Sequence, residues 1–158
     1  MERGRVVALH LCKGHRQPMT PVKEVVAVSD LGLEGDRHAI KGSPRQVLVM
    51  DKETLDGLGL VPGVIKENIT VEGLDLSSVR AGQVFFIGDE VTLEATGPCE
   101  PCSRMDEIRY GLRLELDGRR GIVTMVLNGG TIKVGDAVRV EPSREALLAE
   151  AAHKEATR

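Results

Sequence analysis

Short runs of hydrophobic residues, separated by glycine-rich turns, cover most of the chain before about residue 140. Valine, isoleucine and leucine dominate these runs, and several alternate with polar residues, which is typical of strands. We therefore predict strands over Gly4–Leu11, Val22–Val28, Gln46–Met50, Ile69–Val71, Val84–Ile87, Glu90–Thr96, Ile122–Leu127, Ile132–Val134 and Val138–Val140. The first two runs are expected to pair across the polar turn between them.

Three stretches have the residue spacing of helices. One follows a capping Asp51 and ends near Gly59, one covers Met105–Leu116, and one starts at Ser143. Between the second and third strands lies a polar, glycine-containing loop, Leu31–Ser43, of the kind that often carries function. The pattern predicts a β-rich (α+β) fold, a barrel-like rolled, mostly antiparallel sheet with two or three helices. Residues 1–142 form the domain, and residues 143–158 are its C-terminal helix or tail.

Composition supports a single folded domain. The chain has 158 residues, of which 41% are hydrophobic and 28% are charged, close to the globular average. A chain of this size buries about two thirds of its unfolded surface, enough to fold without disulfides or metals. Disordered and collagen-like classes are therefore excluded.

Charge, hydropathy and cysteine content argue against nucleic-acid binding, membrane insertion and a disulfide framework. The 21 basic and 24 acidic residues give a net charge of −3, so we expect no nucleic acid as the main partner. No apolar run reaches the roughly 18 residues needed to cross a bilayer, and no signal peptide is apparent, so we expect no membrane and a cytoplasmic protein. Three cysteines favour reduced thiols over a disulfide framework.

The most distinctive motif is Cys99-Glu100-Pro101-Cys102, between a predicted strand and a predicted helix. Proline fixes the backbone, and Cys102 lies near a helix N-terminus beside Arg104, where the thiolate is favoured. We predict a reactive or metal-binding sulfur. Three alternatives stay open: structural zinc, a dithiol redox pair, or two buried structural thiols. Zinc would need two further ligands, for which Cys12 and His15 are the candidates.

Two further polar motifs are candidates for ligand binding. In Gly32–His38, Arg37 can grip a phosphate or carboxylate, and His38 can donate a hydrogen bond or transfer a proton. The alternative is a solvated loop whose charges pair with one another. In Lys66–Thr70, Asn68 either orients a ligand or caps a turn.

Taken in order, five motifs resemble one family. They are Gly32–His38, Glu67-Asn68-Ile69-Thr70, Gly88-Asp89, Pro101-Cys102, and Asn128-Gly129-Gly130 through Val134-Gly135-Asp136. Their order and spacing resemble the MOSC domain, named after the carboxy-terminal part of molybdenum cofactor sulfurases, and the match extends over about residues 4–141. The chain is most similar to the small stand-alone bacterial form.

The resemblance implies a barrel-like fold that binds the molybdenum cofactor, a pyranopterin, or handles its sulfur. Cys102 takes the place of the cysteine that ligates molybdenum or carries a persulfide, and a soft thiolate suits this metal. The residues expected to bind the cofactor are Lys13, Arg37, His38, Arg45, Asn68 and Arg104. Cys99 is an additional thiol beside Cys102, and it would serve as a resolving thiol or persulfide acceptor.

The resemblance leaves the activity open between two functions. The first is a protein that binds molybdenum cofactor or carries its sulfur, with cofactor biosynthesis or delivery proteins as partners. The second is a molybdenum-dependent reductase of N-hydroxylated compounds, which would draw electrons from a separate flavin or iron–sulfur protein. A zinc-stabilised interaction module is the third alternative, from outside the family.

Overall fold

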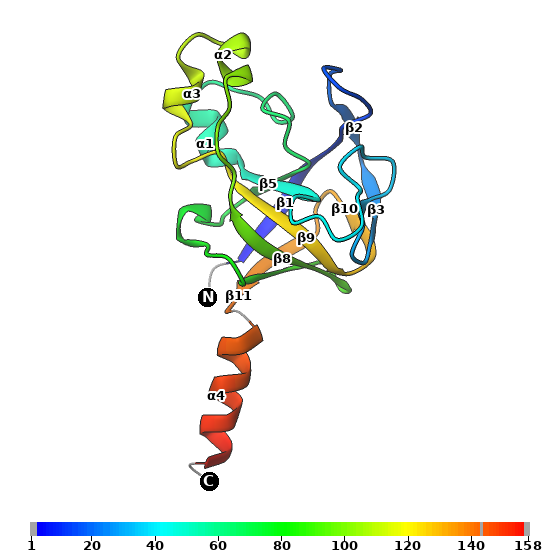
Figure 1. Ribbon diagram of the computed structural model, residues 1–158, viewed down its shortest axis with the longest axis vertical. Helices are drawn as coiled ribbons and strands as arrows, with labels where there is room; N and C mark the ends of the chain where they lie inside the picture. Colours follow the sequence, from blue (N-terminus) through cyan, green and yellow to red (C-terminus); the bar gives the residue numbers. More distant parts are fainter. Residues whose placement is uncertain (1–2, 143, 157–158) are drawn as a thin grey trace.

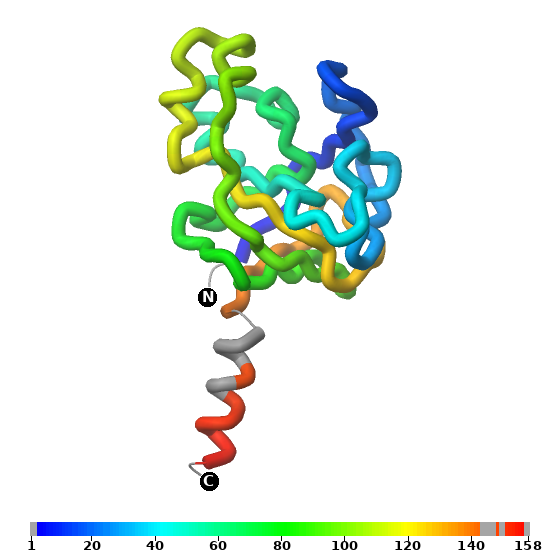
Figure 2. The backbone as a smooth tube through the Cα atoms, viewed as in Figure 1, coloured from blue at the N-terminus to red at the C-terminus, as the bar shows by residue number. Residues whose placement is uncertain are grey.

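Seven strands close into a barrel in the computed structural model, which describes residues 3–142 and 144–156 (Figure 1). Around the ring they are β1 (Arg3–Leu11), β11 (Ala137–Glu141), β7 (Val84–Ile87), β8 (Val91–Pro98), β9 (Ile122–Asn128), β5 (Val47–Asp51) and β6 (Ile69–Glu72). The pairing of β1 with β11 closes the ring, so the first and last strands of the barrel lie side by side (Figure 2). Only β5 and β6 pair in parallel among these neighbours. The predicted β-rich, mostly antiparallel barrel is confirmed.

A small second sheet lies beside the barrel. Its strands, in order, are β10 (Gly130–Lys133), β3 (Glu24–Val28) and β4 (Gly32–Leu33). The single strand expected over Val22–Val28 is wrong, because the chain bends at Lys23. Its first part, β2 (Thr20–Val22), pairs with β1 as predicted, while β3 joins the second sheet.

Three short helices lie together at one end of the barrel (Figure 1). They are α1 (Lys52–Gly57), α2 (Arg104–Ile108) and α3 (Leu112–Glu115), and a 3-10 helix covers Leu76–Ser78. The single helix expected over Met105–Leu116 is therefore two. The break occurs because Arg109 is extended and Gly111 has φ of 85°, a left-handed conformation that glycine adopts without strain. Asp51 caps α1 as predicted, accepting a hydrogen bond from the Thr54 amide.

Two hydrophobic clusters share strand β5. Val47 and Val49 pack in the barrel interior, whereas Met50 packs outside with Leu55 of α1 and with Met105 and Leu112 of the other helices. Both faces of β5 are thus buried, which explains its continuous hydrophobic run. The outer cluster anchors α2 and α3 against the barrel, and so it fixes the segment that precedes α2.

The last helix, α4 (Arg144–Ala156), extends from the end of β11 and is separate from α1–α3 (Figure 1). The predicted helix start at Ser143 lies outside the described residues. No helix in the described part of the chain has the length and apolar character needed to span a membrane.

Candidate functional site

A cavity of about 370 Å³ lies between the loop after β1, the loop after β4 and helix α2. Its lining contains two thiols and an excess of positive side chains. The lining residues that bear on the chemistry are Cys12, Arg16, Arg37, His38, Lys66, Cys102, Arg104, Glu107 and Arg120. A slightly larger cavity of about 430 Å³ near Asp51 and Arg80 has no thiol and none of the predicted site residues in its lining. The first cavity is therefore the candidate site.

Cys102 provides the accessible thiol of this cavity. The residue is exposed, and its carbonyl accepts the hydrogen bond of the Met105 amide at 3.0 Å in the first turn of α2. Met105 is almost completely buried in the outer cluster, so the packing of α2 holds Cys102 at the wall of the cavity. A thiol that is exposed and shares its cavity with several arginines has the surroundings of a reactive or metal-binding cysteine.

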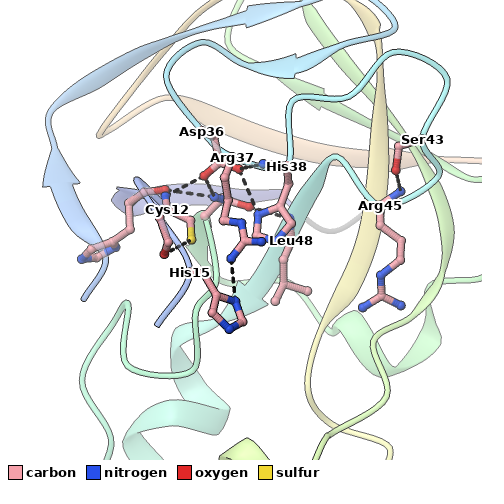
Figure 3. Close-up of polar contacts among 11 residues, drawn as sticks. Cys12, His15, Asp36, Arg37, His38, Ser43, Arg45 and Leu48 are labelled. Atoms are coloured by element: carbon pink, nitrogen blue, oxygen red, sulfur yellow. Dashed lines mark hydrogen bonds and ion pairs between the residues drawn. The ribbon is translucent and has the colours of Figure 1, made fainter. Parts of the chain in front are cut away.

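Asp36 organises the opposite wall from beneath. Its side chain has no exposed surface, and its carboxylate accepts hydrogen bonds from the amides of Cys12 at 2.6 Å and His38 at 2.9 Å. His38 Nδ1 also lies 3.1 Å from this carboxylate (Figure 3). Burial alone would raise the pKa of Asp36, but the hydrogen bonds from His38 and the Cys12 amide outweigh it and lower the pKa. Asp36 therefore stays ionised and holds the two loops together.

The same network defines how His38 faces the cavity. An ionised carboxylate only accepts hydrogen bonds, so Nδ1 of His38 carries a proton and a neutral ring keeps its lone pair on Nε2. The His38 side chain is 49% exposed and lines the cavity. His38 thus offers an oriented group for hydrogen bonding or proton transfer.

Asn68 is a positioning residue below the cavity. Its Nδ2 donates to the His10 carbonyl and to Asp36 Oδ1, both at 3.1 Å, and its Oδ1 accepts from the Leu48 amide at 3.0 Å. The residue is 3% exposed. Asn68 therefore ties β1, β5 and the Asp36 loop together, and its polar atoms are already engaged within the protein.

His15 lies outside the cavity lining, between two arginines that belong to it. Its Nδ1 is 3.1 Å from Arg37 Nη1, and its Nε2 is 3.0 Å from Arg104 Nη2. The positive charge of Arg104 lowers the pKa of His15, and desolvation, Arg37 and Arg16 act in the same direction. Figure 3 shows the ring of His15 next to the guanidinium of Arg37.

Cys99 has the opposite surroundings to Cys102. Its side chain is 3% exposed and packs against Leu48 and Val123. Arg120 Nη1 lies 3.4 Å from the sulfur and Arg45 Nη2 lies 3.8 Å from it. Arg120 also donates to the carbonyls of Glu100 and Ile65, so it crosses from the cavity wall to this buried thiol.

The comparison of the sequence with known families decides the assignment. The sequence model of the MOSC domain matches residues 35–139, about two thirds of the chain. The chain belongs to the MOSC domain family. The predicted family is therefore confirmed.

Solved structures show the same fold as this MOSC domain. The YuaD protein from Bacillus subtilis is 18% identical, with 91% of this chain and all of that chain covered, at a TM-score of 0.77. YiiM from Geobacillus stearothermophilus is 20% identical, with coverage of 87% and 75% and a TM-score of 0.68. YiiM from Escherichia coli is also 20% identical, with coverage of 87% and 69% and a TM-score of 0.64. A comparison with curated proteins finds no match.

The MOSC domain brings some of the predicted site residues together and separates others. Cys102, Arg37, His38 and Arg104 line one cavity. The other four lie outside its lining. Lys13 places its Nζ beside Gly35, Arg45 is exposed and lies apart from Arg37 and His38 (Figure 3), and Cys99 and Asn68 are buried. For Lys13, Arg45 and Asn68, cofactor contact stays a prediction, and so does the role of Cys99 as a resolving thiol or persulfide acceptor.

Three charged lining residues, Arg16, Glu107 and Arg120, were not among the predicted candidates. Cys12 was considered only as a zinc ligand, and Lys66 only as the first residue of the Lys66–Thr70 motif. Arg120 lies two residues before β9, and no local pattern marks an arginine there as buried. A weaker signal was available for two of the lining residues, because Arg16 belongs to the polar turn predicted after the first strand and Cys12 directly precedes it.

The zinc alternative is wrong for this arrangement. Within residues 3–142 and 144–156, no group of three or more His, Cys, Asp or Glu side chains is placed to hold a metal ion. Cys99 is buried against Arg120, Cys102 is exposed in the cavity, and the Cys12 sulfur lies 3.6 Å from the Gly14 carbonyl. His15 contacts two arginines instead of joining these thiols.

Proposed function

We propose that this MOSC domain binds the molybdenum cofactor, with Cys102 as the thiolate ligand of molybdenum, or carries sulfur for the cofactor as a Cys102 persulfide. The observation that carries the proposal is the exposed Cys102 thiol in the wall of a cationic cavity. Membership of the MOSC domain family leads us to expect this cofactor. Substitution of the cavity residues can test whether it binds there.

The charges of the lining fit an anionic pterin ligand. Five lining side chains are Arg or Lys and one, Glu107, is acidic, and Glu107 lies 3.8 Å from Arg16. This excess of positive charge attracts a phosphate or a metal oxyanion. The cavity volume of about 370 Å³ is within the range of small-ligand sites.

Each wall of the cavity would have a separate role. Cys102 would provide the soft sulfur ligand, and Arg37 and Arg104 would hold the anionic part of the cofactor. His38, fixed by Asp36, would hydrogen-bond to the bound molecule or transfer a proton at Nε2. When bound, the cofactor supplies a metal centre for oxygen, sulfur or electron transfer.

The persulfide role uses the same thiol. A carrier cysteine has to reach the protein that donates its sulfur, and Cys102 is the exposed cysteine of the three. Cys99 and Cys12 are each less than 10% exposed. The Cys102 thiolate would attack the outer sulfur of a persulfide on the donor protein, so that the persulfide forms on Cys102 and the donor cysteine leaves as a thiolate.

The test is metal and pterin analysis of protein made in a host that synthesises molybdenum cofactor. We expect molybdenum and oxidised-pterin fluorescence in the wild type, and loss of both in Cys102→Ser with an unchanged circular-dichroism spectrum. Cys99→Ser is the matched control and should retain most of the molybdenum, because Cys99 is buried outside the cavity lining. Equal molybdenum content in wild type and Cys102→Ser would contradict the proposed ligand.

Mass spectrometry of the same samples tests the persulfide role. An added sulfur on the Cys102 peptide, without molybdenum, would identify a sulfur carrier. Turnover of an N-hydroxylated base by the loaded protein, with an artificial electron donor, would extend the proposal to reductase activity. Neither molybdenum nor added sulfur in the wild type would refute both roles of Cys102.

A further inference from the structure

Both ring nitrogens of His15 face a guanidinium group. Arg37 approaches Nδ1 at 3.1 Å from the loop after β4, and Arg104 approaches Nε2 at 3.0 Å from α2. Among the described residues, neither of these arginines forms an ion pair with a carboxylate. Two cations from distant parts of the chain are thus held close together by a single uncharged ring.

This arrangement cannot satisfy both arginines. A guanidinium group only donates hydrogen bonds, and a neutral imidazole has one accepting nitrogen. In one of the two contacts, therefore, an arginine N–H faces the ring N–H and no hydrogen bond forms. A protonated ring would accept from neither. An oxyanion has several accepting oxygens and a negative charge, so it would satisfy both guanidinium groups at once.

We propose that His15 holds the place of an oxyanion between Arg37 and Arg104, and that oxyanion binding displaces the His15 ring. The ligand class is a tetrahedral oxyanion, either free or as the phosphate group of a larger molecule. The inference rests on the proposed function in so far as the molybdenum cofactor would carry such a phosphate. We call the proposed oxyanion site the clamp. It consists of Arg37, Arg104 and His15 and does not depend on the cofactor.

The surroundings of His15 make the displacement depend on pH. The ring faces Arg104 on α2, Arg37 on the loop after β4, and Arg16 on its own loop. Nearby acidic groups have other partners, since Glu107 lies next to Arg16 and Asp36 is buried beneath His38. The three arginines and desolvation lower the pKa of His15, so the ring is neutral at pH 8 and competes with the ligand. As the pH falls, protonation makes the ring a cation that its neighbours repel, which opens the clamp.

The test is calorimetric titration of cofactor-free protein with sulfate at constant ionic strength. Sulfate is the probe because it does not itself titrate between pH 5.5 and pH 8. In the wild type, sulfate affinity should rise about 5-fold to 10-fold from pH 8 to pH 5.5. His15→Ala should bind sulfate about 3-fold to 10-fold more tightly than wild type at pH 8, the effect of one lost competing hydrogen bond. It should also show a smaller pH dependence.

Controls separate His15 from the other histidines. His38 is present in wild type and in His15→Ala, so the difference between the pH profiles of these two proteins reports on His15 alone. His153→Ala, on the exposed part of α4, removes a histidine away from the cavity and should behave as wild type. Arg37→Gln and Arg104→Gln should each weaken sulfate binding about 10-fold or more.

Three results would overturn the inference. They are no sulfate binding in wild type and His15→Ala at either pH, equal affinities of these two proteins at pH 8, or unchanged binding in both arginine variants. All three are independent of molybdenum loading, so the proposed function can fail while the clamp holds. Sulfate titration of cofactor-loaded protein identifies the source of the oxyanion. Lost binding indicates that the clamp holds the phosphate of the cofactor, and retained binding indicates a site for a free oxyanion.

Discussion

Cys99 and Cys102 are three residues apart in one proline-containing segment, yet their surroundings are opposite. Cys99 has the closer contacts with cations, with Arg120 at 3.4 Å and Arg45 at 3.8 Å, but its side chain is 3% exposed. Cys102 is exposed and lines the cationic cavity. The comparison teaches that nearby positive charge does not by itself make a cysteine a site, because a ligand or a donor protein must also reach the sulfur.

The backbone explains the difference. Cys99 follows β8 directly, and its amide donates to the Gly121 carbonyl, so it is still attached to the barrel wall beside β9. After Pro101 the chain no longer follows the barrel wall. Cys102 lies just before α2, where its carbonyl accepts the hydrogen bond of the Met105 amide. The same segment therefore contributes one thiol to the protein interior and one to the cavity.

The largest expected effect is on thiol reactivity. In cofactor-free protein, Cys102 should react with iodoacetamide about 1,000-fold faster than Cys99, because Cys99 reacts only after a local opening that costs about 4 kcal/mol. Mass spectrometry of the two peptides over time gives both rates. Comparable rates would break the comparison, since they would mean that Cys99 is accessible in the native protein.

Arg120→Met should be the most destabilising substitution near Cys99. The change leaves the carbonyls of Ile65 and Glu100 without this donor and removes the cation next to Glu67, at an expected cost of about 3 kcal/mol. Arg45→Met is the matched control, because Arg45 is exposed and its change should cost less than about 1 kcal/mol. Urea unfolding measures both values. Equal losses would show that Arg120 has no special role beneath Cys99.

Asp36→Asn tests the wall opposite Cys102. Asn keeps the size but loses the charge that accepts bonds from Cys12, His38 and Asn68, so we expect a loss of about 2 kcal/mol at pH 7. Because folding lowers the pKa of Asp36, its contribution is present above the unfolded value of about 4 and is lost as the pH falls through the folded pKa. The two proteins should therefore converge in stability near pH 2. A constant difference from pH 7 to pH 2 would exclude this charge effect.

Glu67→Gln should give the smallest effect, with the opposite sign. Glu67 has no exposed surface, and neither of its carboxylate oxygens has a hydrogen-bond partner among the described residues. Burial raises the pKa of Glu67, although the amides of Glu67, Gly63 and Ile65 and the charge of Arg120 act in the opposite direction. The stability associated with Glu67 is complete below its unfolded pKa of about 4.3 and is lost as the pH rises through the folded pKa. We therefore expect Glu67→Gln to be about 1 kcal/mol more stable than wild type at pH 8 and similar at pH 4. Lower stability at pH 8 would contradict this account.

Local sequence patterns predicted much of the barrel because its strands are short, aliphatic and bounded by turns. The strand Val84–Ile87 has the predicted limits, and β5 (Val47–Asp51) is displaced by one residue from the predicted Gln46–Met50. The pattern missed the break between α2 and α3 because Met105 of α2 and Leu112 of α3 pack into one cluster although they come from two helices. The spacing of hydrophobic residues predicts which side chains are buried, but it does not predict the change of backbone direction at Gly111.

The candidate site was predictable where residues belong to recognisable motifs. Cys102, Arg37 and His38 lie in such motifs and share the cavity. Arg120 and the His15 contacts depend on long-range packing, since Arg104 and His15 are 89 residues apart in the sequence. The motif containing Asn68 was recognised, but its position beneath the wall could only come from the structure.

The most direct test of the central claim is alkylation of Cys102 in protein loaded with molybdenum cofactor, compared with the same protein after the cofactor is removed. If Cys102 is the molybdenum ligand, the fraction of Cys102 protected from iodoacetamide should equal the molybdenum content per chain, and removal of the cofactor should restore rapid alkylation. Cys102 that is alkylated equally fast in fully loaded and cofactor-free protein would contradict the account.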